Sequence, residues 1–249
     1  MQTWGLTDPG NIRQQNQDSY AIVPFARDRV LMIVCDGMGG AKSGNVASSL
    51  AVEVFTGEVR RTQKAGMTPE KAAAMLRSAL ELANRAVYEQ SQLSEDFTGM
   101  GTTLVAAFLS RDLAVIINVG DSRAYIMSGG TLRQISEDHS YVEEMRRLGR
   151  ISEADARSPP QKNLITRAVG VDATVDGDLF EQTLADGDIL LLCSDGLTGM
   201  VEDGKIAEVL AGAGTLEDKG RELLTLALEG GGRDNITVAL FTCGAKQEA

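Results

Sequence analysis

The chain has 249 residues, of which 43% are hydrophobic and only 4% aromatic. It is long enough for one large β-rich or α+β domain with a mainly aliphatic core. Its 24 Lys and Arg against 35 Asp and Glu give a formal net charge of −11. Such a charge disfavours long-range attraction to nucleic acid or anionic lipid, so neither partner is expected. The acidity favours solubility, and bound cations could offset part of it.

The three cysteines are Cys35, Cys193 and Cys243, and each sits in an apolar run. The odd count and wide spacing favour reduced core thiols over a disulfide or a zinc site. No apolar run approaches the roughly 18–20 residues of a membrane span. The first residues lack the basic start and apolar core of a signal peptide. We therefore expect a cytoplasmic protein with no membrane partner.

The first half of the chain alternates between strand-like and helix-like patterns. Apolar and β-branched runs predict strands, and apolar residues at helical spacing predict a helix through 46–55. A second helix is expected after Thr68-Pro69-Glu70, because Thr is a good N-cap and Pro fits the first turn. The strands expected here are 18–23, 30–35, 102–109, 113–119, 123–128 and 131–135.

The second half opens with a polar, Arg-rich stretch at 140–170 that carries short helical patterns. Further strands are expected at 179–184, 189–194 and 236–242, and amphipathic helices near 203–213 and 216–229. Strands joined by tight turns pair antiparallel, and paired helices pack as layers on sheet faces. We expect one domain, 1–249, of the α+β class, with two sheets face to face and a helical layer outside each.

Five aspartates lie at the edges of these apolar strands. They are Asp18, Asp36, Asp121, Asp195 and Asp234. A single Asp-Gly pair is usually a plain turn. However, a carboxylate at the edge of a core is costly unless it is hydrogen-bonded or paired with a cation. Carboxylate oxygens are the ligands that Mg²⁺ and Mn²⁺ prefer, so a shared cation site is a plausible interpretation.

Seven short segments, taken in order, make the pattern specific. They are GNIRQQNQD (10–18), DGMGG (36–40), GTT (101–103), GDSR (120–123), DHS (138–140), SDGL (194–197) and DN (234–235). With them, the whole chain resembles the PPM-type (type 2C) metal-dependent Ser/Thr protein phosphatases in their compact bacterial form. That resemblance implies an αββα four-layer sandwich, in which two mainly antiparallel sheets are flanked by pairs of helices.

The resemblance also implies a set of roles. Asp18, Asp36, Asp195 and Asp234 would be ligands of two central Mn²⁺ or Mg²⁺ ions, with the carbonyl of Gly37 completing one shell. Asp36 and Asp195 would form the catalytic centre. Two such cations bridge a water and lower its pKa, so that it attacks phosphorus directly.

Two further roles follow from the same resemblance. Asp121, together with Asp195, would hold a third and weaker ion. Arg13 would bind the phosphate, since a guanidinium suits a tetrahedral oxyanion better than lysine does. The residues around 140–170, including the helical pattern at 143–150, fall where the family carries a flap beside its active site.

Some positions depart from the family pattern or leave alternatives open. Gln17 and Asn45 stand where Glu is frequent, and Ala41 stands where these members usually carry His, which leaves the proton donor unassigned. His139, the only histidine, could donate a proton, but a structural role is the preferred interpretation. Arg123 is expected to pair with a carboxylate inside the fold.

We therefore expect an active phosphatase for phosphoserine and phosphothreonine, monomeric by default, that reverses a bacterial Ser/Thr kinase. There are two rival functions. One is a phosphoprotein-binding module without turnover, and the other is a regulatory phosphatase domain for sigma-factor antagonists. Arg13 and all five aspartates argue against the binding module, and Arg13 argues against the regulatory domain, whose relatives generally lack this arginine.

Overall fold

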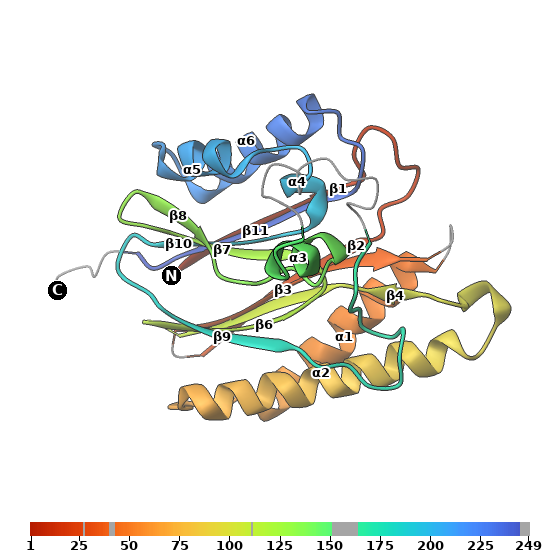
Figure 1. Cartoon of the computed structure of the whole chain (residues 1–249). Coiled ribbons are helices and arrows are strands. Elements are labelled where there is room, and N and C mark those ends of the chain that lie inside the picture. Colours follow the sequence, from red (N-terminus) through yellow and green to blue (C-terminus); the bar gives the residue numbers. More distant parts are fainter. Residues whose placement is uncertain (27, 40–42, 111, 151–163, 245–249) are drawn as a thin grey trace.

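Two antiparallel sheets lie face to face in the structure, which is a computed structural model that describes residues 1–26, 28–39, 43–110, 112–150 and 164–244 (Figure 1). Sheet 1 has the strand order β1 (Gln2–Asp8), β11 (Ile236–Thr242), β10 (Ile189–Cys193), β7 (Arg123–Ser128) and β8 (Thr131–Gln134). Sheet 2 has the order β2 (Asp18–Phe25), β3 (Arg29–Met38), β5 (Leu104–Leu109), β6 (Leu113–Val119) and β9 (Asp178–Thr183), with β4 (Gly101–Thr102) beside β3.

Helices cover the outer face of each sheet. Sheet 2 is covered by α1 (Gly44–Thr62) and α2 (Pro69–Ser91), and sheet 1 by α4 (Asp195–Thr198), α5 (Asp203–Ala211) and α6 (Leu216–Glu229) (Figure 1). The short η1 (Glu95–Phe97) and α3 (Tyr141–Arg147) lie outside these layers. The four-layer α+β sandwich is thereby confirmed. No helix in the described ranges is both long and apolar enough to span a bilayer.

Strand alternation explains how sheet 2 fills two apolar layers at once. Leu31, Ile33 and Cys35 of β3 pack toward α1 and α2, whereas Met32 and Val34 pack toward sheet 1. Successive side chains of a strand point to opposite faces, so one apolar run serves both layers. A third apolar layer lies between sheet 1 and its helices.

The expected cysteine chemistry and helix start are both confirmed. Cys35, Cys193 and Cys243 form no disulfide within the described residues, and all three are buried. The helix after Thr68 begins at Pro69, and the Thr68 side chain accepts a hydrogen bond from the backbone of Lys71. Capping of this kind satisfies a backbone donor that has no partner inside the helix.

Three differences between the expected and the observed strands exceed a shift of one or two residues at an end. β1 is absent from the sequence-based prediction; it pairs along its whole length with β11, from Gln2 opposite Thr242 to Asp8 opposite Ile236. The expected strand 102–109 is split at Thr103 into β4 and β5, and β3 runs on to Met38. In each case pairing with a distant strand decides the boundary, and that partner is invisible to a local pattern.

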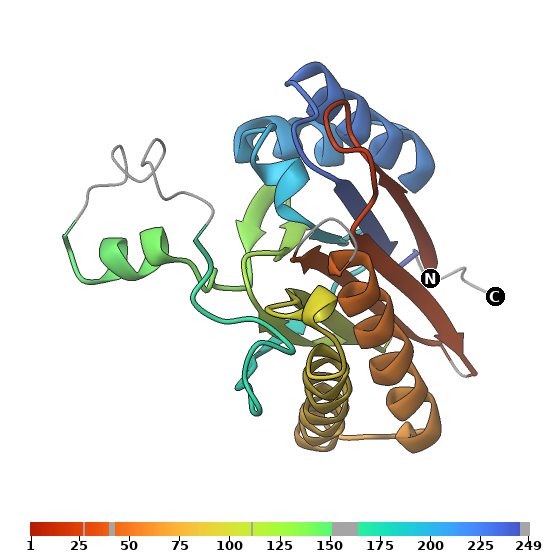
Figure 2. The ribbon, with the colours of Figure 1, turned by 90° about the vertical axis from the view of Figure 1, so that its right-hand side faces the viewer.

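The segment 140–170 carries α3, which stands out from the body of the protein (Figure 2). Its base is tied back by two isolated bridges, Ser140 with Ile165 and Thr102 with Val169. Residues 151–163 lie outside the described residues. The flap and the single-domain boundaries stay predictions.

Candidate active site

Carboxylates from both sheets come together at one rim of the sandwich. Asp18 on β2 lies opposite Asp36 on β3 in the antiparallel register. Asp195 follows β10 directly and begins α4, and Asp234 precedes β11. Burial raises the pKa of Asp36 well above its usual value, and the charges of Asp18, Asp195, Asp121 and Asp234 raise it further. The five predicted aspartates therefore share one electrostatic site.

Asp18 is held by two hydroxyl groups and leaves one oxygen unused. The side chain is only 6% exposed. Its Oδ2 accepts hydrogen bonds from Ser194 Oγ at 2.7 Å and Thr237 Oγ1 at 2.6 Å. Its Oδ1 is buried without a hydrogen-bond partner among the described residues. Burial raises the pKa of Asp18 to about 7 although both hydroxyls oppose the rise.

Asp195 repeats this feature on the other sheet. Its Oδ1 is also buried and has no hydrogen-bond partner in the described part of the chain. Burial raises the pKa of Asp195, the charge of Asp234 adds to the rise, and a hydrogen bond with Asp36 opposes it. A buried carboxylate oxygen without a donor is costly, and a cation is the partner that would relieve it.

The Asp36-Gly37 and Asp195-Gly196 pairs are more than plain turns. A Cβ on Gly37 would lie 2.0 Å from the backbone oxygen of Gly44, and a Cβ on Gly196 would lie 1.9 Å from that of Asn235. Any side chain at either position would therefore displace backbone that packs beside the site. This close approach fits the prediction that the Gly37 carbonyl takes part in the site, without testing it.

Arg13 lies at the exposed edge of the site. Its side chain is 53% exposed, and Nη2 donates to Asp234 Oδ2 at 2.8 Å. This hydrogen bond raises the pKa of Arg13, and the charges of Asp36 and Asp195 contribute as well. The structure thus brings the predicted phosphate ligand to the carboxylates. In this conformation one of its N–H groups is taken up by Asp234.

Asn235 positions the loop that carries Arg13, a role that the sequence motif alone did not reveal. Its Oδ1 accepts from the backbone N–H of Gln17 at 2.7 Å. Its Nδ2 donates to the carbonyl oxygens of Pro9 at 2.9 Å and Gln15 at 3.0 Å. One amide side chain therefore ties β11 to the 9–17 loop at three points.

Asp121 lies in the loop between β6 and β7, next to the other carboxylates. Burial raises its pKa to about 7, and the charge of Asp195 is the next largest cause. Thr103 links this loop to Asp36: Thr103 Oγ1 accepts from the Asp36 backbone N–H at 2.9 Å and lies 2.7 Å from Ser122 Oγ. Thr103 is not among the predicted site residues, although the GTT segment (101–103) to which it belongs is one of the seven family segments.

Two other predicted residues do not face the substrate site. Arg123 donates to Asp138 through Nε at 2.9 Å and Nη2 at 2.7 Å, as expected for a partner inside the fold. His139 is 8% exposed, accepts from the Gly120 backbone and contacts Asp178, which agrees with a structural role. Ala41 lies outside the described residues, and Asn45 lies in the first turn of α1.

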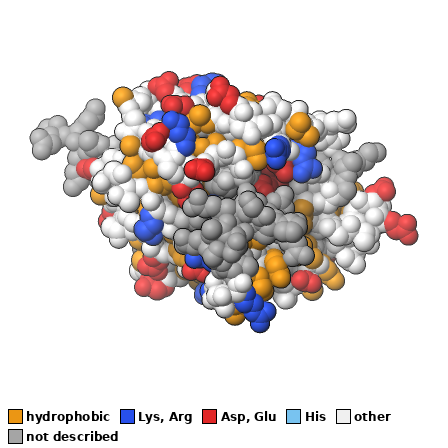
Figure 3. All heavy atoms as spheres, turned by 45° about the horizontal axis from the view of Figure 1, so that its top comes forward, with side chains coloured by type: hydrophobic (Ala, Val, Ile, Leu, Met, Phe, Trp, Pro, Cys, Tyr) orange, Lys and Arg blue, Asp and Glu red, His pale blue; other side chains and the backbone are white. Residues whose placement is uncertain are grey.

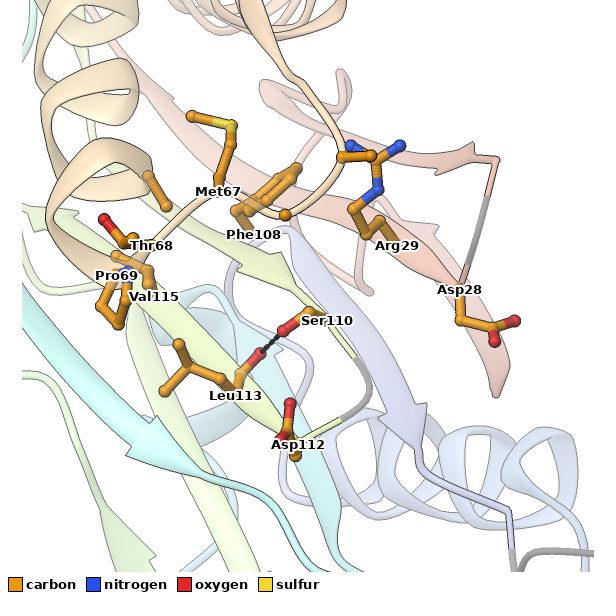
Figure 4. Close-up of a pocket in the computed structure, with 13 residues that line it drawn as sticks. Asp28, Arg29, Met67, Thr68, Pro69, Phe108, Ser110, Asp112, Leu113 and Val115 are labelled. Carbon is orange, nitrogen blue, oxygen red and sulfur yellow. Dashed lines mark hydrogen bonds between the residues drawn. The ribbon is translucent and has the colours of Figure 1, made fainter.

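A cavity of about 390 Å³ lies away from these carboxylates, at the opposite end of sheet 2 (Figure 4). Its apolar wall includes Met67, Phe108 and Leu113, and Asp28 and Asp112 stand on its rim. The residues that line it lie next to Val30 and Leu109, which pair at the end of β3 and β5 far from Asp36. It contains none of the predicted site residues.

An αββα sandwich with clustered carboxylates and an arginine at its rim defines the class of metal-dependent phosphatases. The family model for Protein phosphatase 2C matches residues 12–226, and the chain belongs to this family. It is thus a phosphoprotein phosphatase of the serine/threonine class.

Related proteins agree over nearly the full length. The chain is 42% identical to the serine/threonine phosphatase stp of Listeria monocytogenes, over 94% of this chain and 92% of the relative. It is 36% identical to the protein phosphatase PhpP of Streptococcus pneumoniae, over 95% of each. The solved serine/threonine phosphatase of S. agalactiae superposes with a TM-score of 0.90 at 38% identity, covering 96% of this chain and 98% of that one.

This family is metal-dependent, and the residues present fit divalent cations. The two buried oxygens without donors, Asp18 Oδ1 and Asp195 Oδ1, belong to the hard ligand type that Mg²⁺ and Mn²⁺ prefer. Among the described residues, no three Asp, Glu, His or Cys side chains form a ready-made cage for one ion. Backbone carbonyls and water would therefore supply the remaining ligands, as is usual for Mg²⁺.

Proposed function

We propose that this phosphatase hydrolyses phosphoserine and phosphothreonine with two central Mn²⁺ or Mg²⁺ ions held by Asp18, Asp36, Asp195, Asp234 and the carbonyl of Gly37. When bound, such a pair of cations supplies an activated bridging water for direct attack on phosphorus. The observation that carries the proposal is the pair of buried, donor-less oxygens on Asp18 and Asp195, which come from opposite sheets.

The carboxylates would bind cations because they gather several negative charges in a buried site. Burial and mutual repulsion raise the pKa values of Asp36 and Asp195, so the metal-free site carries an unfavourable charge that cations relieve. Asp36, on β3, is repelled by the charges of both Asp18 and Asp195. It would therefore hold cations together with these two residues. Asp121, whose pKa also responds to Asp195, would serve a third ion.

Arg13 would bind and orient the phosphate group. Within the described residues its hydrogen bond to Asp234 uses Nη2, and no partner is found for Nε or Nη1. Those two groups can form the paired hydrogen bonds that a guanidinium makes with phosphate oxygens. The charge of Arg13 would also stabilise the negative charge of the transferring phosphoryl group.

The proposed partners are phosphoproteins and a cognate Ser/Thr kinase whose output the enzyme reverses. On the face shown in Figure 3, Lys and Arg side chains are interspersed with Asp and Glu, which supports a function without nucleic acid. Three buried cysteines that form no disulfide in the described part of the chain are consistent with the proposed cytoplasmic location. We propose a monomer that acts without a membrane partner.

Turnover of p-nitrophenyl phosphate and of a phosphothreonine peptide tests this function. We expect activity with Mn²⁺ and none with excess EDTA, and recovery when Mn²⁺ is restored. Asp112→Asn is the matched control for Asp36→Asn, because Asp112 is an exposed carboxylate at the other end of sheet 2. Activity that persists in EDTA would contradict the metal mechanism. Phosphopeptide binding without turnover in any metal would instead favour a binding module.

A further inference from the structure

The loop that carries Asp121 is clamped on both sides. On one side, Ser122 Oγ lies 2.7 Å from Thr103 Oγ1. On the other side, the backbone N–H of Gly120 donates to Nδ1 of His139 at 3.1 Å. The second contact comes from the buried imidazole of His139. It holds Gly120, the residue that directly precedes Asp121. His139 has a structural role, and its contacts show which part of the structure it supports.

The contacts of His139 determine its tautomer. A backbone N–H can only donate, so Nδ1 must be the unprotonated nitrogen of the neutral ring. The ring proton is then on Nε2, which donates to Asp178 Oδ2 at 3.1 Å. Arg167 Nη1 also lies 3.2 Å from Nε2, but an arginine can only donate, and this nitrogen has acceptors in Asp178 Oδ1 and the carbonyl oxygen of Asp176. Asp178 is itself held through Oδ1 by Arg167 Nη1 at 2.8 Å. The imidazole is therefore oriented from behind, in the way that outer carboxylates orient a functional histidine.

Gly120 has little freedom to move away from this contact. Its φ is +101°, and a Cβ there would lie 2.6 Å from Cγ2 of Thr103. Its carbonyl oxygen accepts from the backbone N–H of His139 at 3.0 Å and from Asn118 Nδ2 at 3.2 Å. Both polar backbone groups of Gly120 thus bond to His139, one through the ring and one through the main chain.

We propose that His139 is a positioning residue for Asp121: its Nδ1 holds the Gly120 amide so that the Asp121 carboxylate faces Asp195. The inference rests on the proposed function, in which Asp121 serves a third ion. His139 touches neither substrate nor the carboxylates directly. Its effect reaches the site through the backbone of Gly120, and its ring is kept in place by Asp178.

Two amide substitutions of His139 distinguish a role of its Nδ1 as hydrogen-bond acceptor from a role in which the ring only fills space. In His139→Asn the amide oxygen can take the place of Nδ1, whereas in His139→Gln the amide lies nearer to Nε2. We would count bound Mn²⁺ by electron paramagnetic resonance and calorimetry in wild type and both variants, with Asp121→Asn defining the third ion. His139→Gln should lower the affinity for the third ion by about 10-fold or more, as loss of a contact behind a metal ligand does. His139→Asn should retain this affinity, and binding of the two central ions should be unchanged in both variants.

A second pair of variants, at Asp178, tests the inference even if the His139 variants fold poorly. Asp178 is 41% exposed, so its substitution should leave the fold intact. Asp178→Asn keeps an acceptor for Nε2–H, whereas Asp178→Ala removes it and should weaken only the third ion. Equal effects of Asn and Gln at His139, or loss of the central pair together with a lower Tm, would overturn the inference. If Asp121→Asn removes no ion, the third-ion part of the proposed function fails and the inference fails with it, while the EDTA result for the central pair still stands.

Discussion

The hydroxyl of Thr237 donates a 2.6 Å hydrogen bond to Oδ2 of Asp18, across 219 positions of the chain. Ser194 donates to the same oxygen, and its own Oγ accepts from the Thr237 backbone at 2.9 Å. The two hydroxyls occupy one carboxylate oxygen and leave Oδ1 as the oxygen available to the site. The hydroxyls of Ser194 and Thr237 therefore fix which oxygen of Asp18 faces the site.

Thr237→Val should weaken binding of Mn²⁺ by about 10- to 100-fold, because it removes a donor that orients a proposed metal ligand while keeping the shape of the side chain. Thr237→Ser is the matched control and should retain most of the affinity, since it keeps the hydroxyl. Calorimetric titration of the metal-free protein measures both. Equal Mn²⁺ affinities in the two variants would show that the hydroxyl does not position Asp18.

The metal-free protein should lose stability as the pH rises through about 7. Asp18 and Asp121 have folded pKa values of about 7 against an ordinary value of 3.8. Between these values the folded state keeps protons that the unfolded state has released, so stability is highest at the acidic end and falls as the pH increases. Thermal melts in EDTA at several pH values measure this, and Asp18→Asn should flatten the slope.

Added Mn²⁺ should reverse that loss. At pH 8 both carboxylates are charged and available, so Mn²⁺ should raise the Tm strongly. At pH 5.5 protons compete for the same oxygens, and the rise should be smaller. A shift in Tm that is independent of pH would mean that the ions bind elsewhere.

Asp36→Asn and Asp195→Asn should abolish turnover yet stabilise the metal-free protein. Each substitution removes a buried charge whose pKa is raised by burial and by neighbouring carboxylates. A gain of about 1 kcal/mol would raise the Tm by about 2–4 °C in a domain of this size. Melting curves in EDTA and assays in Mn²⁺ measure the two effects on the same samples. Retained wild-type turnover in either variant would remove that residue from the catalytic centre.

Arg13→Ala should raise KM for a phosphothreonine peptide by about 10-fold or more, because a charge-assisted hydrogen bond contributes about 1.5–3 kcal/mol. The KM of Arg13→Lys should lie between those of the wild type and Arg13→Ala, since an ammonium group keeps the charge but loses the paired hydrogen bonds. Steady-state kinetics at saturating Mn²⁺ separate KM from kcat. Unchanged values of both would show that Arg13 stays with Asp234 during turnover.

The sequence alone was enough to predict most of the fold and the identity of the candidate ligands. The continuous apolar run of β3 and the Thr68-Pro69 start of α2 are local signals, and both are confirmed. The ordered motifs carried the family resemblance and named Asp18, Asp36, Asp121, Asp195, Asp234 and Arg13. Short-range patterns carry such information because they depend on side-chain periodicity and on capping groups close in the chain.

Only the tertiary structure decided how these residues are held. β1 becomes a strand because β11, more than 200 positions away, offers it a partner along its whole length. Thr237, Asn235 and His139 act on Asp18, the 9–17 loop and Gly120 through hydrogen bonds between distant segments. Such bonds form once the sheets have brought both groups together, and no local pattern records which oxygen of a carboxylate they occupy. The sequence therefore determined which groups could do the chemistry, and the packing of two sheets determined their orientation.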